Sequence, residues 1–499
     1  MLRILGSPKR LCNGMTRREM LVAGGISLLG VGLSDYLRLA EAQGSPRTPQ
    51  PRSFGRARSC ILLYLYGSPS QLELADCKPN APVEIRGELR PIRSRLSGCD
   101  VCELLPNLGR VIDRMTVVRS MTHPYPIHGV AYATTGVPNI DIPMELNPHD
   151  GRHWPFVGSV VDYVERQRAT PQAGRVPHNI ALPFPFSSRR VGEVPRAGPY
   201  GAFLGNAYNP LWTEFRGEAT RTIVKTLQDQ RWEAGEPYVG VSPESRFVLA
   251  SGTQMPAGLT IDRLDRRRSL LEQLDQARRE HDQQAEQSLD RYRQMAYSLI
   301  GSERIAAALD LDREPIRLRE SYGMTIFGQA ALTARRLVEA GSKFVSVFWD
   351  EYGLAGSGWD THWQHYPRMR NELCPGFDMA IGGLIDDLDQ RGMLDDTLVL
   401  VLSEHGRTPR ITSGNGGGRD HWSEAYTCLF AGGGVARGRV VGRTDAHAAR
   451  VTERPVSPKD VLATVYHLLG IDPETTLVDR TNRPMPLVPD GHVVTEMLA

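Results

Sequence analysis

The chain of 499 residues lacks an apolar run long enough to cross a membrane. The best candidate, residues 20–33, has 14 residues and is rich in glycine, whereas a transmembrane helix needs about 20. We therefore expect no stable membrane span. A short N-terminal membrane anchor stays open as the alternative for this stretch.

An excess of charge of one sign is also absent. The formal net charge is +2, and the first 42 residues alone hold six basic and three acidic side chains, which leaves the rest of the chain near −1. Proteins that bind nucleic acid need a basic face. We therefore expect no nucleic-acid partner.

A second Cys-x-x-Cys pair is missing as well. Cys99 and Cys102 have the spacing of a redox or zinc pair, but a zinc ribbon needs two such pairs. In an oxidising compartment we expect a local disulfide, or a pairing of Cys77 with one of the two. No thioredoxin-like context surrounds them, so a redox role is set aside.

The N-terminus carries the marks of an export signal. Thr16-Arg-Arg-Glu-Met-Leu21 resembles the twin-arginine consensus, and Ala40-Glu-Ala42 offers a cleavage site after Ala42. Residues 43–58 are rich in proline, arginine and serine and are typical of a linker. We expect the twin-arginine export machinery to carry residues 1–42 as a signal peptide and to deliver a periplasmic or secreted protein.

Apolar strands and amphipathic helices alternate over residues 59–499. We expect strands at 60–66, 116–119, 343–349, 397–402 and 426–430, and helices at 328–340, 377–391 and 461–469. This alternation is typical of an α/β domain with a mostly parallel central sheet and helices on both of its faces.

Two stretches interrupt the alternation. Residues 137–215 are rich in proline, glycine and aromatics, and we expect long ordered loops there. Residues 264–300 are charged and helical without a sustained heptad, which favours a solvated helix over a coiled coil. Together they predict a loop and helical insertion at about 137–320.

Three short segments in the last third hold residue types that bind metal ions. Four of the 13 histidines and three acids fall in them: Asp360, His362 and His365; Glu404 and His405; Asp420 and His421. Neutral imidazoles with carboxylates are ligands of Zn²⁺, Mn²⁺ and similar ions. Two of the segments follow buried-strand signals, and ligands at the carboxyl ends of strands are where open α/β sheets place their sites.

Other residues near these segments are candidates for catalysis or binding. Arg407 and Arg419 are suited to an anionic oxygen. The end of the first strand supplies Ser68, Ser70, Glu73 and Asp76, and the end of the second supplies His123 and His128. For the two arginines a surface salt bridge stays open as the alternative, and for Glu73 and Asp76 a solvated loop face.

The order of these motifs resembles the alkaline phosphatase and sulfatase superfamily, and more closely the bacterial family called domain of unknown function 1501. Ser403-Glu-His-Gly406 resembles the Ser-Asp-His-Gly metal motif of the superfamily. The closer resemblance rests on five segments: Gly67-Ser-Pro-Ser-Gln71, Val118-Arg-Ser-Met-Thr-His123, Trp359-Asp-Thr-His362, Gly406-Arg-Thr-Pro409 and Gly418-Arg-Asp-His-Trp422. It implies an alkaline-phosphatase-like fold.

The resemblance also implies a ligand set for a divalent metal ion, which we take as Zn, Mn or Ca. The candidates are Glu73 or Asp76, Asp360, His362, Glu404, His405, Asp420 and His421. One departure is Gln364, which stands where the superfamily often has a histidine four residues after its aspartate.

A second departure concerns the nucleophile. Laying Thr135-Gly136 on the Thr-Gly landmark of sulfatases places Pro126 at the nucleophile and Val130 at the arginine of their Cys/Ser-x-Pro-x-Arg motif. A formylglycine sulfatase is therefore not expected. Ser68, Ser70, Thr134 and Thr135 remain candidate nucleophiles, and His128 a candidate base.

Two hypotheses follow. The first is an exported, metal-dependent hydrolase of phosphate or sulfate esters, with an anionic ester or a sulfated or phosphorylated glycan as substrate. The second is a non-catalytic relative that kept the fold and binds an envelope glycan or partner. The missing nucleophile motif favours the second, and the acid–histidine pairs favour the first.

Overall fold

The computed structural model describes residues 52–138, 142–148, 150, 152–168, 176–191, 196–227, 230–250, 302–354, 358–414, 416–479 and 483–499. The predicted signal peptide and the charged helix expected over 264–300 lie outside these residues. From Ser53 onward the chain forms one compact unit. Within the described ranges, no helix has the length and apolar character that crossing a membrane requires.

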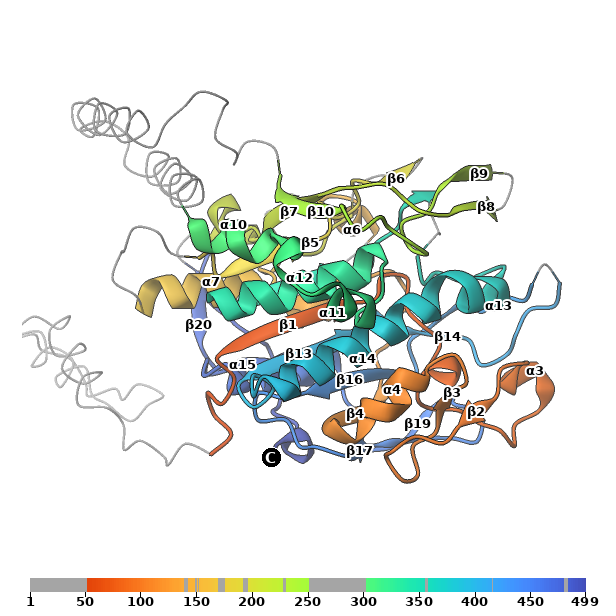
Figure 1. Cartoon of the computed structure of the whole chain (residues 1–499). Coiled ribbons are helices and arrows are strands. Elements are labelled where there is room, and N and C mark those ends of the chain that lie inside the picture. Colours follow the sequence, from red (N-terminus) through yellow and green to blue (C-terminus); the bar gives the residue numbers. More distant parts are fainter. Residues whose placement is uncertain are drawn as a thin grey trace, which may run out of the picture. The chain divides into compact units, whose positions relative to one another are not determined.

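A nine-stranded sheet forms the centre of this unit (Figure 1). Its order is β10 (Arg246–Leu249), β7 (Leu211–Arg216), β5 (Asn179–Leu182), β11 (Phe344–Phe348), β1 (Ser59–Tyr64), β13 (Thr397–Leu402), β16 (Tyr426–Ala431), β4 (Met115–Met121) and β17 (Arg439–Val441). The strands β10 and β16 run antiparallel to their neighbours, and all other pairings are parallel. The predicted α/β class with a mostly parallel sheet is confirmed.

The central strands are apolar throughout because both of their faces are covered. Every residue of β1 and β13 is buried, as expected of parallel strands between two helical layers. Successive residues point to opposite faces, so Ile61 and Leu63 join one apolar core while Leu62 and Tyr64 join the other.

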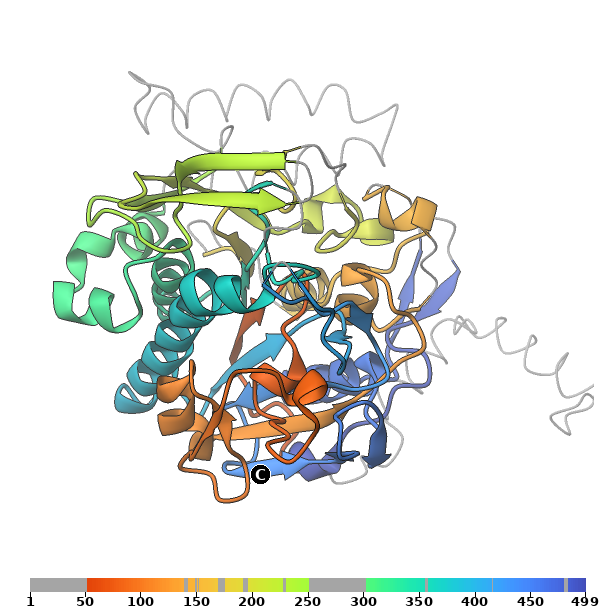
Figure 2. The ribbon, with the colours of Figure 1, turned by 90° about the vertical axis from the view of Figure 1, so that its right-hand side faces the viewer.

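Helices cover each face of the sheet. The first core is closed by α4 (Pro106–Val111), α12 (Ile326–Ala340) and α14 (Cys374–Gln390), and the second by α5 (Val130–Thr135), α7 (Val157–Arg168) and α15 (Pro458–Leu468). Figure 2 shows the molecule at right angles to Figure 1, with the green and cyan helices of the first layer to the left of the sheet. The two-sided covering predicted from the sequence is therefore present.

The helix ends follow from local chemistry. Thr325 caps α12 by accepting from the amide of Gly328, and Gly341, at φ +114°, ends it in the left-handed region that favours glycine. Ser457 and Asp460 form a reciprocal capping box at the start of α15. The predicted helices 328–340, 377–391 and 461–469 begin two to three residues after the observed starts of α12, α14 and α15.

Shorter elements complete the fold. They are α3 (Val83–Arg86), α6 (Ile142–Glu145), α10 (Glu303–Leu309), α11 (Ile316–Ser321), α13 (His365–Arg368) and a π-helix (Met369–Leu373), with the strand pairs β2 (Pro91–Ile92) and β3 (Val101–Cys102), β6 (Arg190–Val191) and β12 (Gly353–Leu354), β8 (Thr222–Leu227) and β9 (Gln230–Gly235), β14 (Gly406–Arg407) and β15 (His421–Trp422), β18 (Arg443–Thr444) and β19 (Val451–Glu453), and β20 (Thr476–Val478) and β21 (Pro484–Pro486).

The prediction of loops throughout 137–215 is wrong. This stretch supplies α7 and two strands of the central sheet, β5 and β7. β5 has only four residues, lies against β11 and β7, and is followed by Pro183. A strand that short is buried by its neighbours and leaves no periodicity of its own in the sequence.

Two further expectations also need correction. The linker predicted over 43–58 ends earlier, because Ser53 and Ala57 are buried and the Ser53 hydroxyl lies 3.0 Å from His467 Nε2. The predicted disulfide is not formed, since all six cysteines of the described residues are free thiols. Cys99 instead lies with its sulfur 3.2 Å from Nη2 of Arg119.

Candidate metal centre

The candidate centre lies where the carboxyl ends of β1, β11 and β13 meet. Gly67 and Ser68 follow β1, Asp360 lies in the segment after β11, and Glu404 and His405 follow β13. These three strands are parallel neighbours, so the segments that leave them emerge at one edge of the sheet. The sequence therefore brings distant polar segments together through strand order alone.

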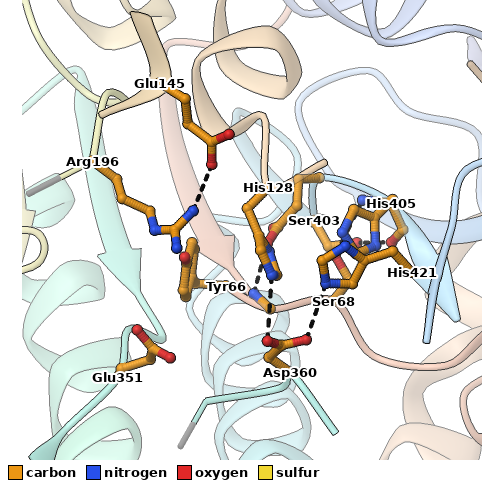
Figure 3. A network of polar contacts seen from close by, with 12 residues as sticks. Tyr66, Ser68, His128, Glu145, Arg196, Glu351, Asp360, Ser403, His405 and His421 are labelled. Atoms are coloured by element: carbon orange, nitrogen blue, oxygen red, sulfur yellow. Dashed lines mark hydrogen bonds and ion pairs between the residues drawn. The ribbon is translucent and has the colours of Figure 1, made fainter. Parts of the chain in front are cut away.

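Two more histidines reach the same place. His128 lies between β4 and α5, and His421 lies on β15, which pairs with β14 directly after His405. Figure 3 shows the side chains of His128, His405 and His421 pointing toward one another, with the Asp360 carboxylate beside them.

Two overlapping groups of side chains have the spacing of metal ligands. One consists of His128, His405 and His421, and the other of Asp360, His362 and His421, with one ligand atom from each residue within 4.8 Å of the others in its group. Asp360 Oδ1 lies 3.0 Å from His362 Nε2 and 3.3 Å from His421 Nε2, and its Oδ2 lies 3.3 Å from His128 Nε2. Ligand atoms of a tetrahedral zinc ion, at bond lengths of about 2.0–2.1 Å, lie about 3.3–3.4 Å apart, and two of these three distances match that spacing.

His405 provides the clearest test of that fit. Its Nδ1 lies 2.8 Å from the carbonyl oxygen of Gly406, and because a carbonyl only accepts, Nδ1 carries the proton. Its Nε2 therefore bears a lone pair, is buried, and has no hydrogen-bond partner in the part of the chain that the structure describes. A buried acceptor left in this way is what a metal ligand requires.

The protonation states also suit ligation. Burial holds the pKa of His405 well below its ordinary value and lowers that of His421. For His128 burial acts in the same direction, but the carboxylates of Asp360 and Glu404 outweigh it and raise its pKa to about 9. A divalent cation between these acids would take the place of that proton.

Glu404 and Asp420 orient the imidazoles. Glu404 Oε1 lies 2.9 Å from His128 Nδ1 and accepts from the amide of Gly67 at 2.8 Å. Asp420 Oδ1 lies 2.6 Å from His362 Nδ1. Carboxylates behind ligating histidines fix the tautomer and raise the basicity of the ring. Both acids were predicted as ligands, and the structure places each of them behind a histidine.

Arg407 is fully buried and held from several sides. It donates to Asp360 Oδ1 at 2.5 Å, to the carbonyl oxygens of Ser68 and Arg419 at 3.0 and 3.2 Å, and to that of Gly67. The charge of Arg407 outweighs the opposing effect of burial and, with His128, keeps the pKa of Asp360 well below its ordinary value. In this arrangement Arg407 fixes the aspartate, and its predicted contact with a substrate anion stays a prediction.

Glu73 and Arg419 lie together but apart from the histidine groups. Arg419 Nη2 bonds Glu73 Oε1 at 2.6 Å, and Glu73 Oε2 lies 3.7 Å from His365 Nε2. Asp76 is paired elsewhere, with Lys78 Nζ at 2.9 Å and with the hydroxyl of Thr444. Neither Glu73 nor Asp76, the two acids that follow β1, therefore lies in the histidine groups of the candidate centre.

The hydrogen bonds of the candidate nucleophiles distinguish Ser68 from the others. Ser68 is fully buried at φ +68°, and its hydroxyl accepts from the amide of His405 at 3.1 Å. Ser70 caps the 3-10 helix Gln71–Glu73, and the Thr135 hydroxyl accepts from the amide of Val137. Of the hydroxyls named in the predictions, Ser68 is the one bonded to a residue of the histidine groups. Its left-handed backbone is costly for a serine, and strain of this kind clusters at functional sites.

A family comparison accounts for nearly the whole compact unit. Residues 57–498 match the family model described as Protein of unknown function (DUF1501). The chain belongs to the DUF1501 family. The match covers all nine strands of the central sheet and every ligand candidate of this DUF1501 chain, and it confirms the resemblance inferred from the motifs. No curated protein matches the sequence.

Solved structures similar to this DUF1501 chain include sulfatases and other members of the alkaline phosphatase superfamily. Ps i-CgsB has 11% identity and a TM-score of 0.39, covering 87% of this chain and 75% of its own. The PsFucS1 sulfatase from Pseudoalteromonas sp. has 13% identity and a TM-score of 0.35, covering 97% and 76%. A protein in the alkaline phosphatase superfamily from Vibrio parahaemolyticus has 13% identity and a TM-score of 0.34, covering 90% and 72%.

Sequence reasoning missed one residue of this DUF1501 site. Arg368, at the end of α13, is buried beside the segment that carries Asp360. No motif contains it, and it is one of many arginines in the chain. His128, expected as a base, lies within one of the ligand groups.

Proposed function

We propose that this DUF1501 protein is a divalent-metal-dependent hydrolase of anionic esters, with a phosphate or sulfate ester as its substrate. The observation that supports it best is the unpartnered, buried Nε2 of His405 within a group of imidazoles. An isolated buried acceptor is destabilising, and a metal ion would satisfy it.

The side chains divide into those that hold the ion and those that orient them. His128, His405, His421 and Asp360 are the proposed ligands, with His362 as a fifth candidate. A bound divalent ion would supply Lewis-acid polarisation of the ester oxygen. A set dominated by imidazoles favours Zn²⁺ or Mn²⁺ over Ca²⁺, because Ca²⁺ takes oxygen ligands.

Ser68 is the proposed nucleophile. Its hydroxyl is held by the amide of His405 at 3.1 Å, and its position at the end of β1 is fixed by the Arg407 guanidinium on its own carbonyl oxygen. A hydroxyl placed in this way is oriented before substrate arrives. The side chains of His421 and His362 are 23% and 24% exposed, so substrate would approach from their side.

Metal analysis combined with turnover tests this proposal. We expect the full chain, purified after export, to contain a divalent metal and to hydrolyse an aryl phosphate or aryl sulfate. The variants H405A and D360A should lose both metal and turnover, S68A should lose turnover but keep metal, and H447A, at an exposed histidine, should change neither. Protein without metal would overturn the proposal, and full turnover in S68A would remove Ser68 from it.

A non-catalytic binding protein is the second candidate. It is favoured by the sequence at the sulfatase nucleophile motif, where Pro126 and Val130 stand in place of the nucleophile and the arginine. In this case the chain would bind an envelope glycan without turning it over. Metal content together with binding of a sulfated polysaccharide and no hydrolysis of any aryl ester would establish this candidate over the first.

Export by the twin-arginine route is part of the proposal. Arg17 and Arg18 followed by an apolar stretch support it, and it places the enzyme in the periplasm or outside the cell. A chain with both arginines replaced by lysine should stay in the cytoplasm. Normal export of that chain would contradict the route.

A further inference from the structure

Arg368 is a buried cation whose bonds go to main-chain oxygens. Its side chain donates to the carbonyl oxygen of Asp360 at 3.0 Å and to that of Gly358, and the residue is 3% exposed. Among the described residues it forms no ion pair and its Nε has no hydrogen-bond partner, although the charges of Glu372 and Asp360 act on it. Burying a charge in this way is costly, so a role that offsets the cost is expected.

The two carbonyls that Arg368 binds belong to the segment that carries Asp360. This segment also packs against the end of β1, where the amide of Trp359 donates to the carbonyl oxygen of Tyr66 at 3.0 Å. The planar guanidinium forms bonds in fixed directions. By holding the carbonyls of residues 358 and 360, it fixes the main chain from which the Asp360 carboxylate projects.

The backbone around Arg368 supports this function. Arg368 ends α13 and is followed at once by the π-helix Met369–Leu373. Extra residues of this kind within a helix re-aim side chains and are frequent at functional sites. Glu372, one turn further on, lies 3.4 Å from the buried Lys225 Nζ, which in turn lies 2.5 Å from Glu236. Lys225 therefore ties the π-helix to the β8–β9 hairpin.

We infer that Arg368 is a positioning residue, which holds Asp360 in place as a metal ligand through the main chain. The inference rests on the proposed function, because it assigns Asp360 as a ligand. Arg407 binds the Asp360 carboxylate and Arg368 binds the backbone below it. The aspartate is thus held by two buried arginines at two different points.

Metal affinity and the cobalt absorption spectrum of the full chain test the inference. We expect R368M to weaken Zn²⁺ binding by about 10- to 100-fold, the range for residues that orient ligands, and to change the spectrum of the Co²⁺-loaded protein. The zinc affinity of R368K should lie between those of R368M and the wild type, because a single ammonium group cannot form the two directed bonds of the planar guanidinium. R370M is the control, since Arg370 is 41% exposed and bonds Glu88, and it should match the wild type.

The outcomes separate the inference from the proposed function. Wild-type protein that binds no metal overturns both. Wild-type protein that binds metal, together with R368M of unchanged affinity and unchanged cobalt spectrum, overturns the inference alone. If R368M does not fold, R368K decides, and wild-type affinity and spectrum in that variant overturn the inference. A purely structural role would lower the thermal stability of the metal-free protein without changing the cobalt spectrum.

Discussion

At the scale of single residues, Gly67 shows how little space separates the parts of the centre. Its amide donates to Glu404, and its φ of +92° lies in the left-handed region. A Cβ built on it would lie 2.3 Å from the backbone nitrogen of Asp360. Neither atom can rotate away, because the nitrogen belongs to the main chain and the position of a Cβ is fixed by the backbone. Glycine is therefore required at this position for two reasons: the left-handed backbone conformation and the lack of space for a Cβ.

We expect G67A to displace Asp360 and to weaken metal binding at least tenfold. The matched control is G341A, because Gly341 also has positive φ, at +114°, but has nothing within 4 Å of the added Cβ. G341A should lose about 1 kcal/mol of stability from the left-handed backbone and keep its metal affinity. Competition with a chelator measures the affinity. Equal affinities in the two variants would contradict the steric argument.

Two glutamates with similar pKa values differ in burial and so in their effect on stability. Burial raises the pKa of Glu73, but Arg419 and His365 outweigh it and lower it to about 2. Hydrogen bonds from Arg454 lower the pKa of Glu496 to about 2 as well. Glu73 is 2% exposed, whereas the Glu496 side chain is 45% exposed. Solvent screens the second pair, so its contribution to folding is small.

We therefore expect the acid stability to depend on Glu73. A carboxyl whose pKa is lowered on folding stabilises the protein above its unfolded value of about 4.5 and loses that effect as the pH falls toward about 2. E73Q should be much less stable than the wild type at pH 7, with a gap that narrows below pH 4.5, while E496Q should follow the wild type. Urea unfolding at several pH values measures this. A pH-independent gap for E73Q would contradict it.

At the scale of elements, Arg335 links two of the helices that cover the first core, α12 and α14. It lies on α12 and contacts Glu314 at 2.7 Å and Asp387 of α14 at 2.9 Å. Its side chain has no exposed surface. Removing one partner from a buried network leaves charge without a counter-ion, which costs more than the pair contributes.

We expect R335M to lower the free energy of unfolding by about 3–5 kcal/mol. The control R443M removes an exposed arginine paired with the exposed Glu453, a loss of no more than about 1 kcal/mol. Denaturant unfolding gives both values. Metal affinity should be unchanged in R335M, because Arg335 contacts no ligand candidate. Similar values for the two variants would show that the network contributes little.

The elements also show what the sequence could and could not predict. Strands β1 and β13 and helices α12, α14 and α15 carry continuous apolar runs or strong helical periodicity with clear caps, and their predicted bounds agree with the structure to within a few residues. Strands β5 and β7 were not predicted, because tertiary neighbours stabilise them and not their own pattern.

For the candidate site, strand order made Asp360, His405 and His421 predictable as neighbours, since each follows or adjoins an element that could be recognised. Glu73 and Asp76 share the loop after β1 with Ser68 but point to other partners. The direction of a loop side chain depends on turns that residue spacing alone does not define. Arg368 was missed for the same reason, because it acts from a helix end with no motif.

At the scale of the whole molecule, the centre is made from segments that lie far apart in the chain. Its ligand candidates run from His128 to His421, and the strands that carry them pair only when β4, β11, β1 and β13 are all in place. No short fragment of the chain therefore contains the centre. Metal binding would stabilise only the folded state, and added metal should raise the unfolding temperature.

Because the ligands come from distant segments, the compartment in which the chain folds determines where the site can first bind a metal ion. The ligands cannot gather before the sheet is complete, so the site first becomes able to bind an ion in the compartment in which the chain folds. Under the proposed twin-arginine route, which carries folded proteins, that compartment is the cytoplasm. The first ion to reach the site would then come from the metal supply inside the cell, even though the proposed enzyme would work outside it.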